Sequence, residues 1–276
     1  MGKRTVRKSV AVTAVKQRCR LAKWLLFSFG LFYVLPVIAQ GALYLLSGPQ
    51  EHWSRADRSS IGIAPLPAEA PQAFVQVYAA RTWGWRSVFA VHTWFAIKPA
   101  HALDWERLEV IGFGVSRGRP AVRSSYGPPD TRWFGHDPVV LAELRGAAAE
   151  AAIPRLRAAA EAYPYPRSYD AWPGPNSNTF TAHLARAVPE LRLDLPATAI
   201  GKNYPIRGWR SLMPSGTGWQ FTLGGFAGIG VGLEEGVELD LFGLSAGLDL
   251  KPPALRLPGL GRLGWNQQHP GRRSGW

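Results

Sequence analysis

A loop-to-helix junction holds the residues with the clearest potential for chemistry in this sequence. Residues 173–175 read Pro-Gly-Pro and oppose a helix, whereas apolar residues then recur at four-residue spacing over Phe180–Val188, as on one helix face. Asn176 and Ser177 therefore lie where a helix begins. Backbone N–H groups and the helix dipole can serve an anion or a nucleophile there, although an ordinary helix also takes Asn or Ser as its cap.

Ser177 is the residue at this junction that could attack a substrate. A serine nucleophile needs a hydrogen-bonded base and donors for the developing oxyanion. His92 is the candidate base, because it lies in an apolar strand-like run and can project toward the helix start. Asn176 or Asn178 would supply the auxiliary donor. The alternative interpretation makes His92 a hydrogen-bonded core residue and Asn176 or Ser177 a helix cap.

The remaining candidate groups predict neither a cofactor nor a metal site. Cys19 is the sole cysteine, so the chain has no internal disulfide and no thiol nucleophile in its body. His136 precedes Asp137 in a turn that more simply caps the following helix. No Walker loop, GxGxxG or HExxH motif occurs. The other histidines form no cluster with ligand spacing: His52, His101, His183 and His269.

The elements that must position these residues indicate an α+β fold. A stretch rich in Ala, Leu, Glu and Arg predicts helix over residues 138–162, with a kink or break at Pro154. We therefore expect a domain over residues 71–218 that consists of an antiparallel sheet with segregated helices. Alternating or continuous apolar runs predict its strands over residues 74–78, 88–97, 108–115 and 121–126.

The order of these motifs resembles that of circularly permuted papain-like hydrolases, which include relatives of NlpC-type cell-wall peptidases and lecithin:retinol acyltransferase-like proteins. The resemblance covers about residues 74–190 and rests on His92, then Tyr163-Pro-Tyr165, then Asn176-Ser-Asn-Thr-Phe180. It implies a permuted papain-like fold with Ser177 in the nucleophile position. In that family a cysteine stands there, and a serine hydroxyl ionises far less readily than a thiol.

The body also resembles a bacterial membrane-protein family known only as a domain of unknown function. This resemblance is more specific but implies no activity. It is carried by Arg81-Thr-Trp-Gly-Trp85, Ala90-Val-His-Thr-Trp94, Trp172-Pro-Gly-Pro-Asn-Ser-Asn-Thr-Phe180 and Ala199-Ile-Gly-Lys202.

The N-terminal region predicts a membrane anchor. Residues 24–47 carry no charge and, as a helix, would cross a hydrocarbon core about 30 Å thick. The preceding residues 1–23 are basic and contain no acid, so the positive-inside rule places them in the cytoplasm and the body across the membrane. We therefore expect a single-pass protein that contacts lipid through residues 24–47. A cleaved signal peptide that ends near Ala39 is the alternative.

The segments around the domain complete the predicted organisation. Residues 48–70 are expected to form a linker, residues 219–264 a Gly-rich β extension with a hairpin over 229–241, and residues 265–276 a tail. Glycines at 228, 230 and 232 leave one face of a strand bare. Either another group packs closely on that face, or the extension is an apolar ribbon that touches lipid.

Charge and motifs together favour a protein of the cell envelope. The net charge of +13 is concentrated in the N-terminal tail, and no basic stripe with interleaved aromatic residues follows, so nucleic-acid binding is not predicted. One hypothesis is a hydrolase or acyltransferase that uses Ser177 and His92 on envelope peptide, amide or ester bonds. The alternative is a non-catalytic envelope protein whose groove binds a peptide, a glycan or a lipid.

Overall fold

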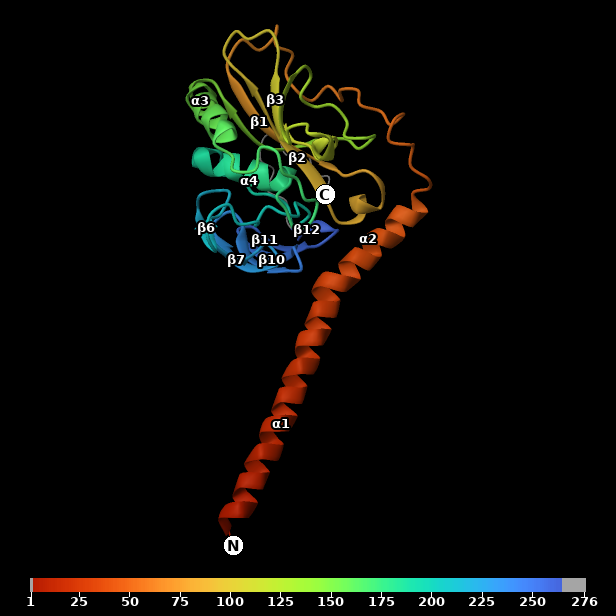
Figure 1. The fold of residues 1–276 in the computed structure, drawn as a ribbon, viewed down its shortest axis with the longest axis vertical. Helices are drawn as coiled ribbons and strands as arrows, with labels where there is room; N and C mark the ends of the chain where they lie inside the picture. The colour runs from red at the N-terminus through yellow and green to blue at the C-terminus, as the bar shows by residue number, and fades with distance from the viewer. Residues whose placement is uncertain (1, 265–276) are drawn as a thin grey trace.

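The computed structural model describes residues 2–264, which form one long N-terminal helix and a body with two antiparallel sheets (Figure 1). The helix consists of α1 (Gly2–Phe29), a π-helical segment (Gly30–Val34) and α2 (Leu35–Leu46). Its part Lys16–Leu46 has 31 residues and is long and apolar enough to cross a membrane. The predicted apolar helix is therefore present.

The first sheet has five strands in the order β4-β3-β2-β1-β5, and every neighbouring pair is antiparallel. Strands β1, β2 and β3 are adjacent in this sheet and are buried along almost their whole length. This is the antiparallel sheet that the sequence predicts. The strands are β1 (Phe74–Arg81), β2 (Val91–Lys98), β3 (Glu106–Val110), β4 (Val122–Tyr126) and β5 (Val139–Arg145).

Two helices, α3 (Ala147–Glu161) and α4 (Ser177–Ala187), cover one face of this sheet. The predicted helix over 138–162 is wrong in its first part, because residues 139–145 form β5. Val139 and Val140 favour extended structure, and β1 supplies a partner for them. Pro154 lies inside α3 without dividing it.

The opposite face of the first sheet is covered by loops rather than helices. Trp94 and Trp105 are fully buried there, packed with residues of the segment predicted as a linker, including Ile63 and Ala64. The carboxylate of Asp130 accepts hydrogen bonds from the backbone N–H groups of both linker residues, at 2.6 and 3.0 Å. Part of the predicted linker therefore completes the core.

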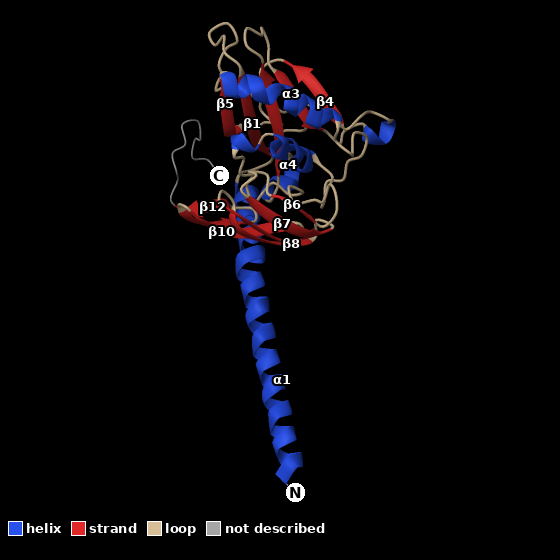
Figure 2. Ribbon diagram, turned by 90° about the vertical axis from the view of Figure 1, so that its left-hand side faces the viewer, coloured by secondary structure: helices blue, strands red, loops and turns tan. Residues whose placement is uncertain are grey.

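The second sheet is a meander of seven strands, in the order β12-β11-β10-β9-β8-β7-β6. The predicted hairpin over 229–241 is present as β8 and β9 within this larger sheet. Helix α4 lies between the two sheets, and α1 extends away from the body on the side of the second sheet (Figure 2). The strands are β6 (Arg210–Leu212), β7 (Gly218–Leu223), β8 (Ala227–Gly232), β9 (Gly236–Leu241), β10 (Leu244–Leu250), β11 (Pro253–Leu257) and β12 (Gly261–Gly264).

Candidate functional site

Asn176 is the N-cap of α4. Its Oδ1 accepts hydrogen bonds from the backbone N–H groups of Asn178 and Thr179, at 2.9 and 3.2 Å. Thr179 Oγ1 accepts one in return from the Asn176 backbone, which completes a capping box. The Asn176 amide also donates to Ile200 O, and it lies so close to Gly201 that a Cβ there would be 2.5 Å from it. This side chain is therefore engaged in the structure of the helix start.

Asn178 ties the same turn to the sheet. Its amide donates to Val91 O at 3.1 Å and to Ile200 O at 2.7 Å, and its Oδ1 lies 2.9 Å from Thr93 Oγ1. All of these groups are buried, so each lost bond would leave a polar atom without water. The three contacts occupy the donors and the acceptor of the Asn178 amide.

Ser177 is the first residue of α4 and is 4 % exposed. Among the residues 2–264 that the structure describes, none offers a hydrogen-bond partner to Ser177 Oγ. A serine nucleophile requires a base within about 3 Å of that oxygen. Ser177 is therefore buried at the start of α4 but lacks the hydrogen-bonded base that would activate its hydroxyl.

His92 lies on the other face of the first sheet. Successive side chains of a strand point to opposite faces, and Thr93 points toward α4, where it also contacts Thr181 at 2.9 Å. His92 therefore points away from α4 and stacks on Trp133, with 3.7 Å between ring centroids. The structure does not bring His92 and Ser177 together. The sequence correctly groups His92 with Trp94 on one strand face, but that face is the one covered by loops.

The partner of His92 is Glu109 on β3, a residue that the sequence analysis did not single out. His92 Nε2 lies 2.7 Å from Glu109 Oε2, and the same oxygen accepts a hydrogen bond from Arg107 Nη2 at 2.8 Å. The Arg107 guanidinium lies over the Trp94 ring at 4.0 Å. The detectable signal is the spacing of Arg107 and Glu109, two positions apart in β3, which places both on one face of the strand.

The electrostatics of this cluster favour a neutral histidine beside an ionised carboxylate. Burial lowers the pKa of His92, against the influence of Glu109. Burial alone would raise the pKa of Glu109, but the hydrogen bond from His92 and the charge of Arg107 outweigh it and lower that pKa. His92 then donates its Nε2 proton to Glu109. The three side chains are almost inaccessible to a substrate, since none is more than 10 % exposed.

The other histidines that the sequence raised have ordinary contacts. His136 Nε2 lies 3.3 Å from Gln50 Nε2, and His183 Nε2 lies 3.0 Å from Ala159 O. Within the described part of the chain, no three His, Cys, Asp or Glu side chains gather so as to hold a metal ion.

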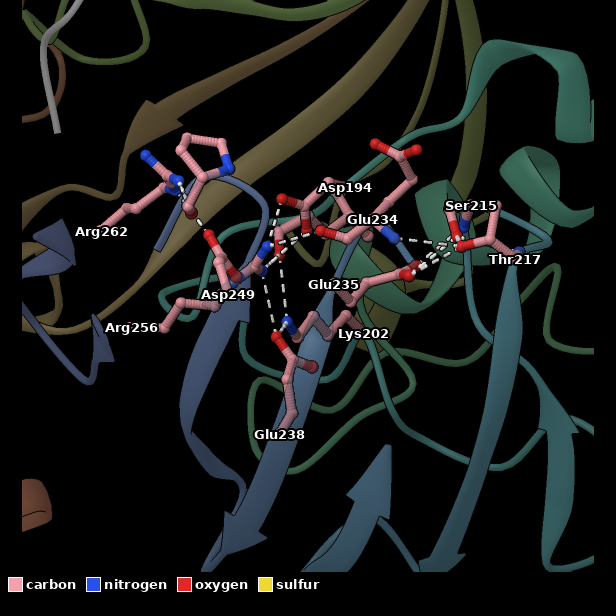
Figure 3. A network of polar contacts seen from close by, with 12 residues as sticks. Asp194, Lys202, Ser215, Thr217, Glu234, Glu235, Glu238, Asp249, Arg256 and Arg262 are labelled. Carbon is pink, nitrogen blue, oxygen red and sulfur yellow. Dashed lines mark hydrogen bonds and ion pairs between the residues drawn. The ribbon is translucent and has the colours of Figure 1, made fainter. Parts of the chain in front are cut away.

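A second buried polar cluster joins the loop after α4 to the inner face of the second sheet (Figure 3). Lys202 Nζ contacts Glu238 Oε1 at 2.7 Å and donates to Leu195 O at 3.0 Å. Arg256 forms ion pairs with Glu238, Asp194 and Asp249. Lys202 is 2 % exposed, and its contacts hold two layers of the body together.

Comparison with known proteins finds a family model that matches the first sheet and its helices. No curated protein matches the chain, and no solved structure does. The permuted papain-like relationship thus has no support from a related structure. The long helix and the whole second sheet lie outside the range that does match. Residues 72–204, which include β1–β5, α3, α4 and the loop to Lys202, match the model of the family described as Protein of unknown function (DUF3750).

Proposed function

We propose that this protein is a single-pass, non-catalytic protein of the cell envelope that binds membrane lipid. The observation that carries the proposal is the exposure of the apolar helix. Only 11 % of its most apolar stretch is buried, and Leu26 and Leu46 are 71 and 83 % exposed. Apolar side chains so exposed over 31 residues favour lipid as their surroundings.

The charges beside the helix support one orientation. Lys16, Arg18, Arg20 and Lys23 precede Trp24, whereas the chain from there to Gly48 carries no charge. Basic flanks remain on the cytoplasmic side of membranes. The proposed arrangement has the N-terminus in the cytoplasm and the body, including the DUF3750 domain, on the far side.

The geometry around α4 favours the non-catalytic alternative over the hydrolase. Asn176 and Asn178 use their amides to hold the helix start, and His92 is engaged with Glu109 on the other face of the sheet. Ser177 is left without a base or a free side-chain donor among the residues expected to serve it. Hydrolysis or acyl transfer through Ser177 therefore lacks the arrangement that it requires.

Extraction and N-terminal analysis test the anchor. Membranes that contain the full chain are washed at alkaline pH, and the mass of the retained protein is measured. A spanning helix keeps the intact chain, including residues 1–23, in the pellet. Release into the supernatant, or loss of the N-terminal residues by cleavage near Ala39, would overturn the anchored arrangement.

Labelling with a fluorophosphonate tests the non-catalytic role. The intact protein in membranes is treated alongside Ser177→Ala, and we expect equal, background labelling of both. Labelling that depends on Ser177 would show an activated hydroxyl and would contradict this part of the proposal. An active serine hydrolase in the same reaction serves as the control for the reagent.

A further inference from the structure

The second sheet has the reverse of the polarity that a sheet at a protein–water boundary normally has. Such a sheet turns its apolar side chains to the core and its polar ones outward. Here Glu238, Asp240 and Asp249 point inward, and each is less than 5 % exposed. The outward face carries large apolar side chains, several of them about half exposed: Trp219, Phe221, Leu223, Ile229, Val231, Val237, Leu239, Leu248, Leu250 and Leu263.

The inward polar groups are paired, so their burial is built into the fold. Asp240 accepts hydrogen bonds from Asn203 Nδ2 at 2.7 Å and from Ser245 Oγ at 2.6 Å. Burial raises its pKa to about 6. The glycines of β8 also belong to this inward face, where a Cβ on Gly230 would lie 2.9 Å from Met213 Sδ. Close packing therefore explains the bare glycine face, and lipid contact concerns the opposite face.

The outward apolar side chains form a continuous surface across the sheet. The register places Trp219 opposite Val231, and Val231 opposite Val237. The row continues through Leu248 to Leu255 on β11. Patches of this extent on a water-exposed surface are unusual and mark a site of contact with a protein or a membrane.

The N-terminal helix identifies the membrane as the occupant. It meets the second sheet at β9 and the turn that follows, where Tyr33 Oη donates to Leu239 O at 2.6 Å and the Phe29 and Phe242 rings lie 6.1 Å apart. From there α1 projects past the outward face (Figure 2). A bilayer that surrounds the helix therefore reaches the same face.

The length of the helix fixes the depth of the sheet. Trp24 precedes Tyr33 by nine residues, which is about 14 Å along a helix. The hydrocarbon core is about 30 Å thick. With Trp24 at the cytoplasmic interface, Tyr33 lies about halfway across the core, and the sheet that contacts it reaches the acyl chains. Leu43 and Leu45, which follow on α2, are 56 and 79 % exposed, as expected for residues in the distal leaflet.

We propose that the outward face of the second sheet lies among the acyl chains of the leaflet distal to the basic tail, so that the body is embedded in the membrane rather than tethered above it. This inference rests on the proposed anchoring and names the lipid surface that the body binds. A second copy is the rival occupant, but it would have to share the face with the α1 helix that projects there.

Site-directed spin labelling tests this placement. Cys19→Ser gives a cysteine-free full chain, and single cysteines then report on each region in lipid nanodiscs. Val231→Cys and Leu248→Cys report on the sheet face, Leu26→Cys reports on the helix, and Leu103→Cys is a control in the first-sheet domain. All four positions are at least 49 % exposed, so a label replaces no buried contact. Collision rates with oxygen, which enters lipid, and with a water-soluble nickel complex are measured.

We expect the two sheet labels and the helix label to collide with oxygen and to lose collisions with nickel, and the Leu103 control to do the reverse. Nickel-accessible sheet labels beside a lipid-exposed Leu26 label would overturn the embedded sheet and leave the anchor intact. Nickel access at Leu26 as well would overturn both. Sheet labels that both reagents miss, with spin–spin coupling between copies, would assign the face to a dimer and also overturn the inference.

Discussion

The orientation of a single strand decides what His92 and Ser177 can do. Thr93 points at α4 and contacts Asn178 and Thr181, so His92 must point to the opposite face. A shift of one residue in β2 would have placed an imidazole where the Thr93 hydroxyl now lies. The polar groups beneath α4 are instead hydroxyls and amides that bind one another, and this arrangement stabilises the helix without activating the serine.

Substitution at Asn178 and at Ser177 should separate structure from chemistry. Asn178→Ala leaves Val91 O and Ile200 O without their buried donor, so we expect the free energy of unfolding to fall by about 2–3 kcal/mol. Ser177→Ala removes a hydroxyl with no partner among the described residues, and the change should stay within about 0.5 kcal/mol. Denaturant unfolding in detergent measures both. A larger loss for Ser177→Ala would contradict this description of the helix start.

The buried His92–Glu109 pair predicts a loss of stability in acid. The pKa of His92 is lowered in the folded state, so its contribution is lost as pH falls below its unfolded value of about 6.5. The lowered pKa of Glu109 removes a further contribution below about pH 4.5. Thermal unfolding of the wild type between pH 8 and pH 4 should show a falling midpoint.

Glu109→Gln is the matched variant for this pH dependence. It leaves the buried Arg107 without the carboxylate that it contacts at 2.8 Å, so we expect a loss of about 3 kcal/mol at pH 7. The change from pH 5 to pH 4 should become smaller than in the wild type. A variant that keeps both the wild-type stability and the wild-type acid response would show that this cluster does not carry the effect.

At the scale of elements, the sequence predicts part of the fold. The strands β1 and β2 and the start of α4 follow from their apolar patterns and from the Pro-Gly-Pro stop. The sequence predicts helix at β5 because its Ala, Glu and Arg residues are good helix formers. The segment is extended in the structure because it pairs with β1. The side of the sheet that α4 covers could not be derived, because the strand pattern is apolar on both faces.

For a related reason, the sequence predicts the second sheet only as a Gly-rich β extension over residues 219–264 with one hairpin. Its strands are short and Gly-rich. Their apolar side chains point outward and their polar ones inward, which is the inverse of the usual arrangement, so the sequence pattern alone would assign the apolar residues to a core. Lys202 contacts Glu238 from outside the sheet. Such a pairing across 36 residues has no local signal.

The ion pairs beneath this sheet should be structurally essential. Lys202→Met removes one of the two ion-pair partners that the buried Glu238 has among the described residues, so we expect a loss of about 3 kcal/mol. Arg155→Met breaks an exposed pair with Glu190 and should cost less than about 1 kcal/mol. Comparison of the two unfolding free energies in detergent decides the point. Equal, small losses would mean that the cluster does not hold the sheet to the loop.

At the scale of the whole molecule, the helix and the second sheet form the side that we propose to face lipid, and residues 72–204, which match the DUF3750 model, lie above them (Figures 1 and 2). The uncharged segment of the sequence predicts the apolar helix. The apolar outward face of the second sheet is recognised only once its strands are paired in the structure. The buried charges and the exposed aliphatic side chains of the sheet have a common explanation if its outward face meets hydrocarbon.

A charge on that face should therefore be costly in lipid. Val231→Lys places an ammonium among acyl chains, and we expect it to lower stability in nanodiscs by about 2 kcal/mol. Tyr126→Lys alters a position of the first sheet that is more exposed than Val231, and its effect should remain within about 0.5 kcal/mol. Thermal midpoints in nanodiscs give the comparison. Equal midpoints for the two variants would contradict lipid contact at Val231.

The central claim, an anchor that separates a basic tail from the body, is tested most directly by thiol labelling in right-side-out membrane vesicles. A membrane-impermeant maleimide is applied to the native chain, whose only thiol is Cys19, and to a Cys19→Ser chain that carries Leu103→Cys. We predict that Cys19 reacts only after the vesicles are permeabilised, whereas the cysteine at position 103 reacts in intact ones. Reaction of Cys19 in intact vesicles, or protection of position 103 until permeabilisation, would contradict the account.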